Sequence, residues 1–162
     1  GLYAQDRKTN LSVTSKQIEK RLNQLEGMFA FILFDDNSKR YIVARDPLGI
    51  IPLYYGFGKA GGFDEKRQLF ISSEMKAIVD VCEEIYCFPP GHYLDSEQGE
   101  IKVYYRPEWK DYLNVATKPA SPEVIHDALV ASVKKHLMSD VPYGVLLSGG
   151  LDSSVMLELS SA

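Results

Sequence analysis

The most constraining feature of this 162-residue sequence is the segment Ser-Gly-Gly-Leu-Asp-Ser-Ser at residues 148–154, which follows an apolar run at residues 144–147. We expect the run to form a short buried strand and a helix to begin within the segment. Two adjacent glycines let the backbone turn tightly and approach a ligand without Cβ atoms in the way. The exposed amides and the helix N-terminus would then present donors to a phosphate group.

The polar side chains of this segment fit the same chemistry. Ser148 and Ser153 add hydroxyl donors, and Asp152 is best explained as a ligand of a bridging Mg²⁺, because a carboxylate would repel a bare phosphate. No lysine follows the glycines, so the segment is not a Walker A loop. The alternative is an ordinary strand-to-helix turn with a serine N-cap.

The first two thirds of the chain predict a sheet-rich α+β layer structure with few helices. Thr14 and Gln17 have capping-box spacing at the start of an amphipathic helix over residues 15–26. Residues 28–34 are an unbroken apolar run, typical of a strand buried on both faces. The further expected elements are a returning strand at 41–44, a break at 46–49, strands at 53–55 and 69–72, a short helix at 73–81, and a hairpin of 93–94 with 101–105.

The chain changes character at residue 106. Residues 106–120 contain two prolines and no periodicity, which indicates a linker between a first domain at 1–105 and a second at 121–162. Ser121 and Pro122 form a strong helix start. An apolar stripe follows at helical spacing: Val124, Ile125, Ala128, Leu129, Val133 and Leu137.

Composition excludes several classes of protein. The net charge is −4 and basic residues form no long run, which argues against a nucleic-acid partner or an anionic membrane surface. The longest apolar stretch, residues 28–34, is too short to span a bilayer. Cys82 and Cys87 make no disulfide framework, so we expect reduced thiols and a cytoplasmic location.

Two parts of the sequence resemble two domains of one family. Residues 136–154, His-Leu-Met-Ser-Asp-Val-Pro-Tyr-Gly-Val-Leu-Leu-Ser-Gly-Gly-Leu-Asp-Ser-Ser, resemble glutamine-hydrolysing asparagine synthetase and contain the pyrophosphate-loop motif of enzymes that cleave ATP to AMP and pyrophosphate. Residues 25–31, 44–55, 72–77 and 88–93 resemble the class II glutamine amidotransferase domain of the same enzymes.

The resemblance implies a fold and a reaction. The fold is the C-terminal half of a sandwiched-sheet glutaminase domain of the N-terminal-nucleophile type, then the first helix, strand and loop of a Rossmann-like ATP-binding domain. In the reaction, ATP activates aspartate as β-aspartyl-AMP and ammonia from glutamine displaces AMP to give asparagine, with Mg²⁺ as cofactor. The implied small-molecule partners are ATP, aspartate and glutamine, and a homodimer is compatible with the family. The implied nucleotide and pyrophosphate site is Leu147, Ser148, Gly149, Gly150, Leu151, Asp152 and Ser153.

The sequence departs from the family at both ends. The family's glutaminase nucleophile is an N-terminal cysteine, whereas residue 1 is Gly and the internal Cys82 and Cys87 do not match that position. We therefore expect a fragment or truncated gene product that does not itself hydrolyse glutamine. We also expect residues 141–162 to be poorly supported, because a single strand and loop leave an edge and an apolar face uncovered.

Two questions stay open at this point. Arg45 and Asp46 have two interpretations. In the first they lie near the glutaminase pocket or the ammonia route between domains. In the second they form a buried ion pair or turn cap that holds the Asp-Pro-Leu-Gly break. The alternatives to an asparagine synthetase are a β-lactam synthetase-like enzyme and a non-catalytic remnant that serves as a binding module.

Overall fold

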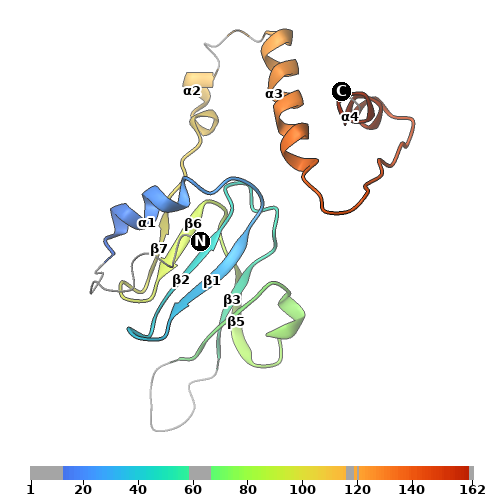
Figure 1. The fold of residues 1–162 in the computed structure, drawn as a ribbon. Coiled ribbons are helices and arrows are strands. Elements are labelled where there is room, and N and C mark those ends of the chain that lie inside the picture. The colour runs from blue at the N-terminus through green and yellow to red at the C-terminus, as the bar shows by residue number, and fades with distance from the viewer. Residues whose placement is uncertain (1–12, 59–66, 116–118, 120, 161–162) are drawn as a thin grey trace. The chain divides into compact units, whose positions relative to one another are not determined.

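The computed structural model describes residues 13–58, 67–115, 119 and 121–160. The chain divides into two compact units, Gly1–Pro107 and Glu108–Ala162. The elements of each unit are drawn in Figure 1. Every helix in the described ranges is too short or too polar to cross a bilayer.

Two antiparallel sheets make up the described part of the first unit. One has the strand order β1 (Ala30–Asp35), β2 (Arg40–Arg45), β6 (His92–Asp95), β7 (Glu100–Val103). The other has the order β4 (Leu69–Ser72), β3 (Tyr54–Gly58), β5 (Cys82–Cys87). The predicted α+β character and the two predicted hairpins, β1–β2 and β6–β7, are confirmed.

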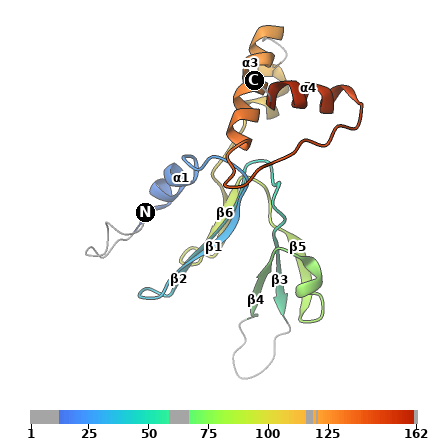
Figure 2. The ribbon, with the colours of Figure 1, turned by 45° about the vertical axis from the view of Figure 1, so that its right-hand side comes forward.

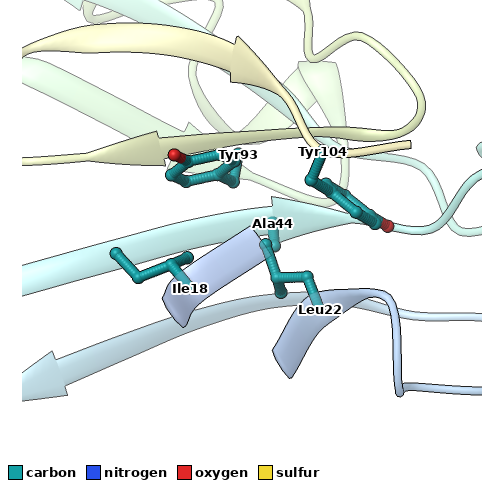
Figure 3. Close-up of a cluster of buried hydrophobic side chains, with 5 residues drawn as sticks. All are labelled: Ile18, Leu22, Ala44, Tyr93 and Tyr104. Atoms are coloured by element: carbon teal, nitrogen blue, oxygen red, sulfur yellow. The ribbon is translucent and has the colours of Figure 1, made fainter. Parts of the chain in front are cut away.

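Helix α1 (Ser15–Leu22) packs on the four-stranded sheet. Gln17 Oε1 accepts a hydrogen bond of 2.9 Å from the backbone N–H of Thr14, as the capping-box spacing predicts. Ile18 and Leu22 join Ala44, Tyr93 and Tyr104 in a buried cluster (Figure 3).

The helix ends at Leu22, four residues before the predicted end at residue 26. Asn23 explains the early stop, because its Nδ2 donates both to Glu19 O (2.9 Å) and to Tyr104 O (2.8 Å). The asparagine side chain thus adds a second donor to a carbonyl that already accepts from the backbone N–H of Asn23 at 3.0 Å, and it fixes the helix end to the segment that follows β7.

Strand β1 is not buried on both faces as predicted. Within the described residues it lies at the edge of its sheet, and Ile32 and Phe34 are 51% and 56% exposed. Phe31, on the opposite face, packs against the cluster below α1. Figure 2 shows the two sheets of this unit diverging toward the β1–β2 hairpin. The face of β1 that carries Ile32 and Phe34 is therefore without cover there.

A second buried cluster joins the two sheets. It consists of Val43, Leu53, Phe88 and Leu94, all at most 7% exposed. Tyr55 of β3 packs against it and makes an edge-to-face contact with Phe88, with ring centroids 5.9 Å apart. The core of the unit therefore lies on both faces of the four-stranded sheet.

The predicted helix at 73–81 is reduced to the single turn η1 (Met75–Ala77), and the strand β5 that follows was not predicted. A β-bulge hides β5 from pattern analysis: the pairing shifts between Phe57, opposite Glu84, and Gly58, opposite Cys82. The extra residue breaks the alternation of side chains on which strand prediction depends.

The second unit is helical in its described part. It contains η2 (Glu108–Lys110), α2 (Tyr112–Val115), α3 (Pro122–His136) and α4 (Leu151–Ser160). Ser121 occupies the N-cap position of α3 and Pro122 its first turn, as predicted. Of the apolar stripe on α3 only Val133 is buried, whereas Val124 remains 67% exposed.

The predicted buried strand at 144–147 is absent from the structure. These residues have no regular secondary structure, and Leu146 is 94% exposed. A strand needs a neighbour to satisfy its N–H and C=O groups, and residues 141–147 form no strand pairing. Residues 141–147 are therefore unsupported, as we expected for the stretch 141–162, whereas α4 contacts α3 and its Leu159 is buried.

Candidate functional site

The glycine-rich segment turns the chain directly into helix α4. Gly149 has φ of +81°, a left-handed conformation that favours glycine, and the helix begins at Leu151. A Cβ on Gly149 would meet nothing within 4 Å, and one on Gly150 would come only to 3.6 Å from Ser148 Oγ. The backbone of this turn is therefore open to a ligand.

The serine hydroxyls close the turn through local contacts. Ser148 Oγ and Ser153 Oγ lie 3.0 Å apart, and Ser153 Oγ donates to Gly150 O at 3.0 Å. Ser154 Oγ donates to the same carbonyl at 2.9 Å. Hydroxyl groups rotate freely, so Ser148 and Ser153 can turn their protons toward an anion that enters the loop.

The carboxylate of Asp152 is exposed in the first turn of α4. A negative side chain is favourable there because the helix N-terminus carries a partial positive charge. Leu147 and Leu151 are 56% and 79% exposed on either side of the loop. The turn can thus offer backbone donors to a phosphate and one oxygen ligand to a hard cation.

All seven residues predicted for this site lie in one exposed turn and the start of one helix. The structure brings the hydroxyls of Ser148 and Ser153 together across the glycines. Their role toward a nucleotide, and that of Asp152 toward a metal, stay predictions.

Arg45 and Asp46 are held together elsewhere, at the end of β2, and both are buried, at 7% and 1% exposed. The carboxylate of Asp46 accepts hydrogen bonds of 3.1 to 3.2 Å from three backbone amides, which are those of Leu48, Ile50 and Ile51. Burial raises the pKa of this carboxyl, but the hydrogen bonds from the amides that follow it outweigh burial and hold the pKa below its ordinary value.

The guanidinium of Arg45 binds carbonyls on both sides of the same loop. It donates to Ile51 O at 2.8 Å, to Gly49 O at 2.7 Å and to Phe88 O at 2.6 Å. A Cβ on Gly49 would lie 2.6 Å from Pro90 Cγ, and its φ is +70°. This geometry is that of a turn cap, and a role of Arg45 and Asp46 near a pocket stays a prediction.

Tyr104 lies at the end of the predicted hairpin of 93–94 with 101–105, and the sequence did not indicate its polar contact. Its hydroxyl donates to Arg45 O at 2.8 Å, and the bond is buried. Burial, together with the nearby Asp46 carboxylate, raises the pKa of Tyr104, so the hydroxyl keeps its proton. The available signal was general: a buried tyrosine needs a partner for its hydroxyl.

The two cysteines lie at opposite ends of β5. Cys82 is partly buried, and Cys87 is exposed with its Sγ 3.2 Å from Arg45 Nη1. Neither lies in the glycine-rich turn.

Comparison with known proteins identifies both halves of the chain. Residues 5–86 match the family model of the glutamine amidotransferase domain, and residues 124–161 match that of asparagine synthase. The first match covers just over half of the chain.

Individual relatives agree with these matches. The chain is 53% identical over 135 residues to asparagine synthetase B (glutamine-hydrolysing) of Escherichia coli. It is 43% identical over 139 residues to a probable glutamine-hydrolysing asparagine synthetase of Schizosaccharomyces pombe and 45% over 142 residues to asparagine synthetase 3 of Arabidopsis thaliana. These alignments cover 83%, 86% and 88% of the chain but 23%, 24% and 23% of the relatives, so the chain spans about a quarter of their length.

Proposed function

Because this chain belongs to the family of glutamine-hydrolysing asparagine synthetases, we propose that it takes part in ATP-dependent synthesis of asparagine, with glutamine as the ammonia donor. It joins an amidotransferase part at 1–105 to the start of a synthetase part at 121–162, with a linker at 106–120. The match of residues 124–161 to asparagine synthase, in a stretch that contains the open turn at 148–153, carries this proposal.

In the proposed reaction, the turn holds ATP through its β- and γ-phosphates. The amides around Gly149 and Gly150 and the hydroxyls of Ser148 and Ser153 bind phosphate oxygens, and Leu147 lies against the nucleotide. Supporting this assignment, the turn is open at both glycines and a helix N-terminus follows it. Asp152, exposed beside the turn, would hold Mg²⁺, which supplies charge neutralisation at the phosphates when bound.

The chemistry that follows is adenylation of aspartate to β-aspartyl-AMP with release of pyrophosphate, then displacement of AMP by ammonia. Groups on this chain contribute binding and orientation of the phosphates. For this part we propose the Rossmann-like α/β fold in the complete enzyme, in which residues 144–147 acquire neighbouring strands that the described residues do not provide.

For the amidotransferase part we propose the sandwiched-sheet fold of N-terminal-nucleophile glutaminases. Its two antiparallel sheets and the buried cluster that joins them support this. Arg45 and Asp46 would fix the loop 46–51 near the glutaminase pocket or the ammonia route. The apolar tip of that loop, with Leu48 66% and Ile50 52% exposed, is consistent with a surface that another part of the enzyme contacts.

The test is aspartate-dependent exchange of pyrophosphate into ATP by the complete protein that carries this chain. We expect Asp152→Asn to lower this exchange by about 100-fold, because a lost metal ligand costs several kcal/mol of charge stabilisation. Asp140→Asn, also exposed but eight residues before the turn that opens at Ser148, is the matched control. If Asp152→Asn does not change the exchange rate, Asp152 is not a metal ligand. If the wild type shows no exchange, the proposed synthesis is wrong and the alternative of a non-catalytic binding module is favoured.

A further inference from the structure

Tyr104 occupies a junction between three separate segments of the first unit. It follows β7 directly and is 7% exposed. Its backbone N–H donates to Gly91 O at 2.9 Å, and its carbonyl accepts from Asn23 Nδ2 at 2.8 Å. Hydrogen bonds at both its N–H and its carbonyl therefore hold the main chain of Tyr104, independently of its side chain.

The hydroxyl of Tyr104 takes the place of a missing strand partner. Pairing between β2 and β6 ends at Ala44 and Tyr93, so the carbonyl of Arg45 lies one residue beyond the ladder. Tyr104 supplies the donor for this buried carbonyl at 2.8 Å. An unsatisfied buried carbonyl would be costly, so this hydroxyl fixes where the end of β2 lies.

The end of β2 is also the base of the loop 46–51. The main-chain carbonyl of Asp46 accepts from Gly49 N and Gly91 N, at 3.1 and 3.0 Å. Gly91 in turn accepts at its own carbonyl from the amides of Tyr104 and Tyr105. One continuous set of hydrogen bonds thus joins this loop to residues 104 and 105, beside the end of the unit at Pro107.

We propose that Tyr104 is a positioning residue for ammonia transfer: its hydroxyl fixes the base of the loop 46–51 to the segment through which the chain leaves the amidotransferase unit. The inference rests on the proposed function, which assigns that loop to the pocket or the ammonia route. Tyr93 belongs to the same cluster but should not have this role. Its hydroxyl donates to Glu19 Oε1 at 3.3 Å, away from the loop.

The first experiment compares Tyr104→Phe with Tyr93→Phe by amide hydrogen exchange, resolved by residue. In the Tyr104 variant we expect exchange at Leu48, Ile50 and Ile51 to rise about five- to tenfold, the factor that one buried hydrogen bond is worth. The β1–β2 ladder should change less than twofold. The Tyr93 variant should leave the loop amides unchanged, although it removes a hydroxyl from the same cluster.

A uniform rise across loop and ladder would show that Tyr104 only stabilises the fold, and unchanged loop exchange would show that it does not hold the loop. Either result overturns the proposal. If the Tyr104 variant fails to fold, the wild type still provides a test, because the Tyr104 hydroxyl proton should exchange slowly enough to be seen by NMR. Its rapid exchange with water would also overturn the proposal.

The second experiment measures asparagine formed per glutamine hydrolysed by the complete protein, normalised to the ammonia-dependent rate of the same variant. We expect Tyr104→Phe to lower this yield at least twofold and Tyr93→Phe to leave it unchanged. An unchanged yield with a loosened loop would refute the role in ammonia transfer. If the wild type makes no asparagine from glutamine, the proposed function fails instead, and the exchange result stands separately.

Discussion

The buried ion pair between Arg40 and Asp95 allows the sharpest prediction about stability. Arg40 Nε donates to Asp95 Oδ1 at 3.0 Å and Nη2 to Oδ2 at 2.7 Å, a bidentate contact. The two side chains are 9% and 0% exposed. Arg40→Met fills most of the same volume but leaves the carboxylate buried without its cation. Removal of one partner from such a pair costs about 3–5 kcal/mol, which is a large fraction of the stability of a domain.

The assay is urea unfolding at pH 7, followed by tyrosine fluorescence. Lys39→Met is the matched control, because Lys39 is the neighbouring residue and its ion pair with Asp36 is exposed, with side-chain exposures of 71% and 84%. That variant should change the free energy of unfolding by less than ~0.5 kcal/mol. The double variant Arg40→Met, Asp95→Leu should recover most of the loss, since an apolar pair carries no buried charge. A loss below about 1 kcal/mol for Arg40→Met alone would refute the buried geometry.

Three further predictions concern the loops. Asp46→Asn should lower the free energy of unfolding by about 2 kcal/mol at pH 7, the worth of charge-assisted hydrogen bonds. Because the native pKa of Asp46 is depressed, this difference between wild type and variant should vanish as the pH falls below about 4 through that pKa. Urea titrations from pH 7 to 2 would show it. Gly49→Ala should cost more than Gly99→Ala in thermal unfolding, since both have positive φ but only at Gly49 would the added Cβ meet another atom, Pro90 Cγ at 2.6 Å; equal losses would contradict the close approach. Leu146→Ser should leave stability within ~0.5 kcal/mol, because the side chain is 94% exposed, and a loss above 1 kcal/mol would show that it is buried.

Sequence patterns predicted elements whose causes are local. The start of α1, the start of α3 and the β1–β2 and β6–β7 hairpins follow from caps and turns within a few residues, and the structure confirms them. The end of α1 was wrong because it depends on Asn23 reaching Tyr104, 81 residues away. Strand β5 was missed because a β-bulge in its pairing with β3 interrupts the alternation of side chains.

Burial was the weakest part of the prediction. An apolar run such as 28–34 indicates that a strand has apolar faces, but it does not indicate what covers them. In the structure Phe31 packs under α1 while Ile32 and Phe34, on the opposite face, are more than half exposed. The same holds for Arg45 and Asp46: their pattern left a turn cap as one of two alternatives, whereas the contact of Tyr104 with Arg45 could be found only from the fold.

The glycine-rich turn separates what a motif determines by itself from what it needs from the rest of a protein. Its left-handed Gly149, its paired serine hydroxyls and the start of α4 all depend on contacts within five residues, and all are present. The strand before it depends on neighbouring strands, and it is absent. The turn can therefore hold its shape without a sheet, but it cannot be fixed relative to a substrate. For the phosphate-binding role proposed above, catalysis would come mainly from positioning, so the absence of a sheet around residues 144–147 should reduce turnover far more than it reduces binding of pyrophosphate. Pyrophosphate that binds to this chain as tightly as to the complete protein, with no ATP cleavage, would bear this out.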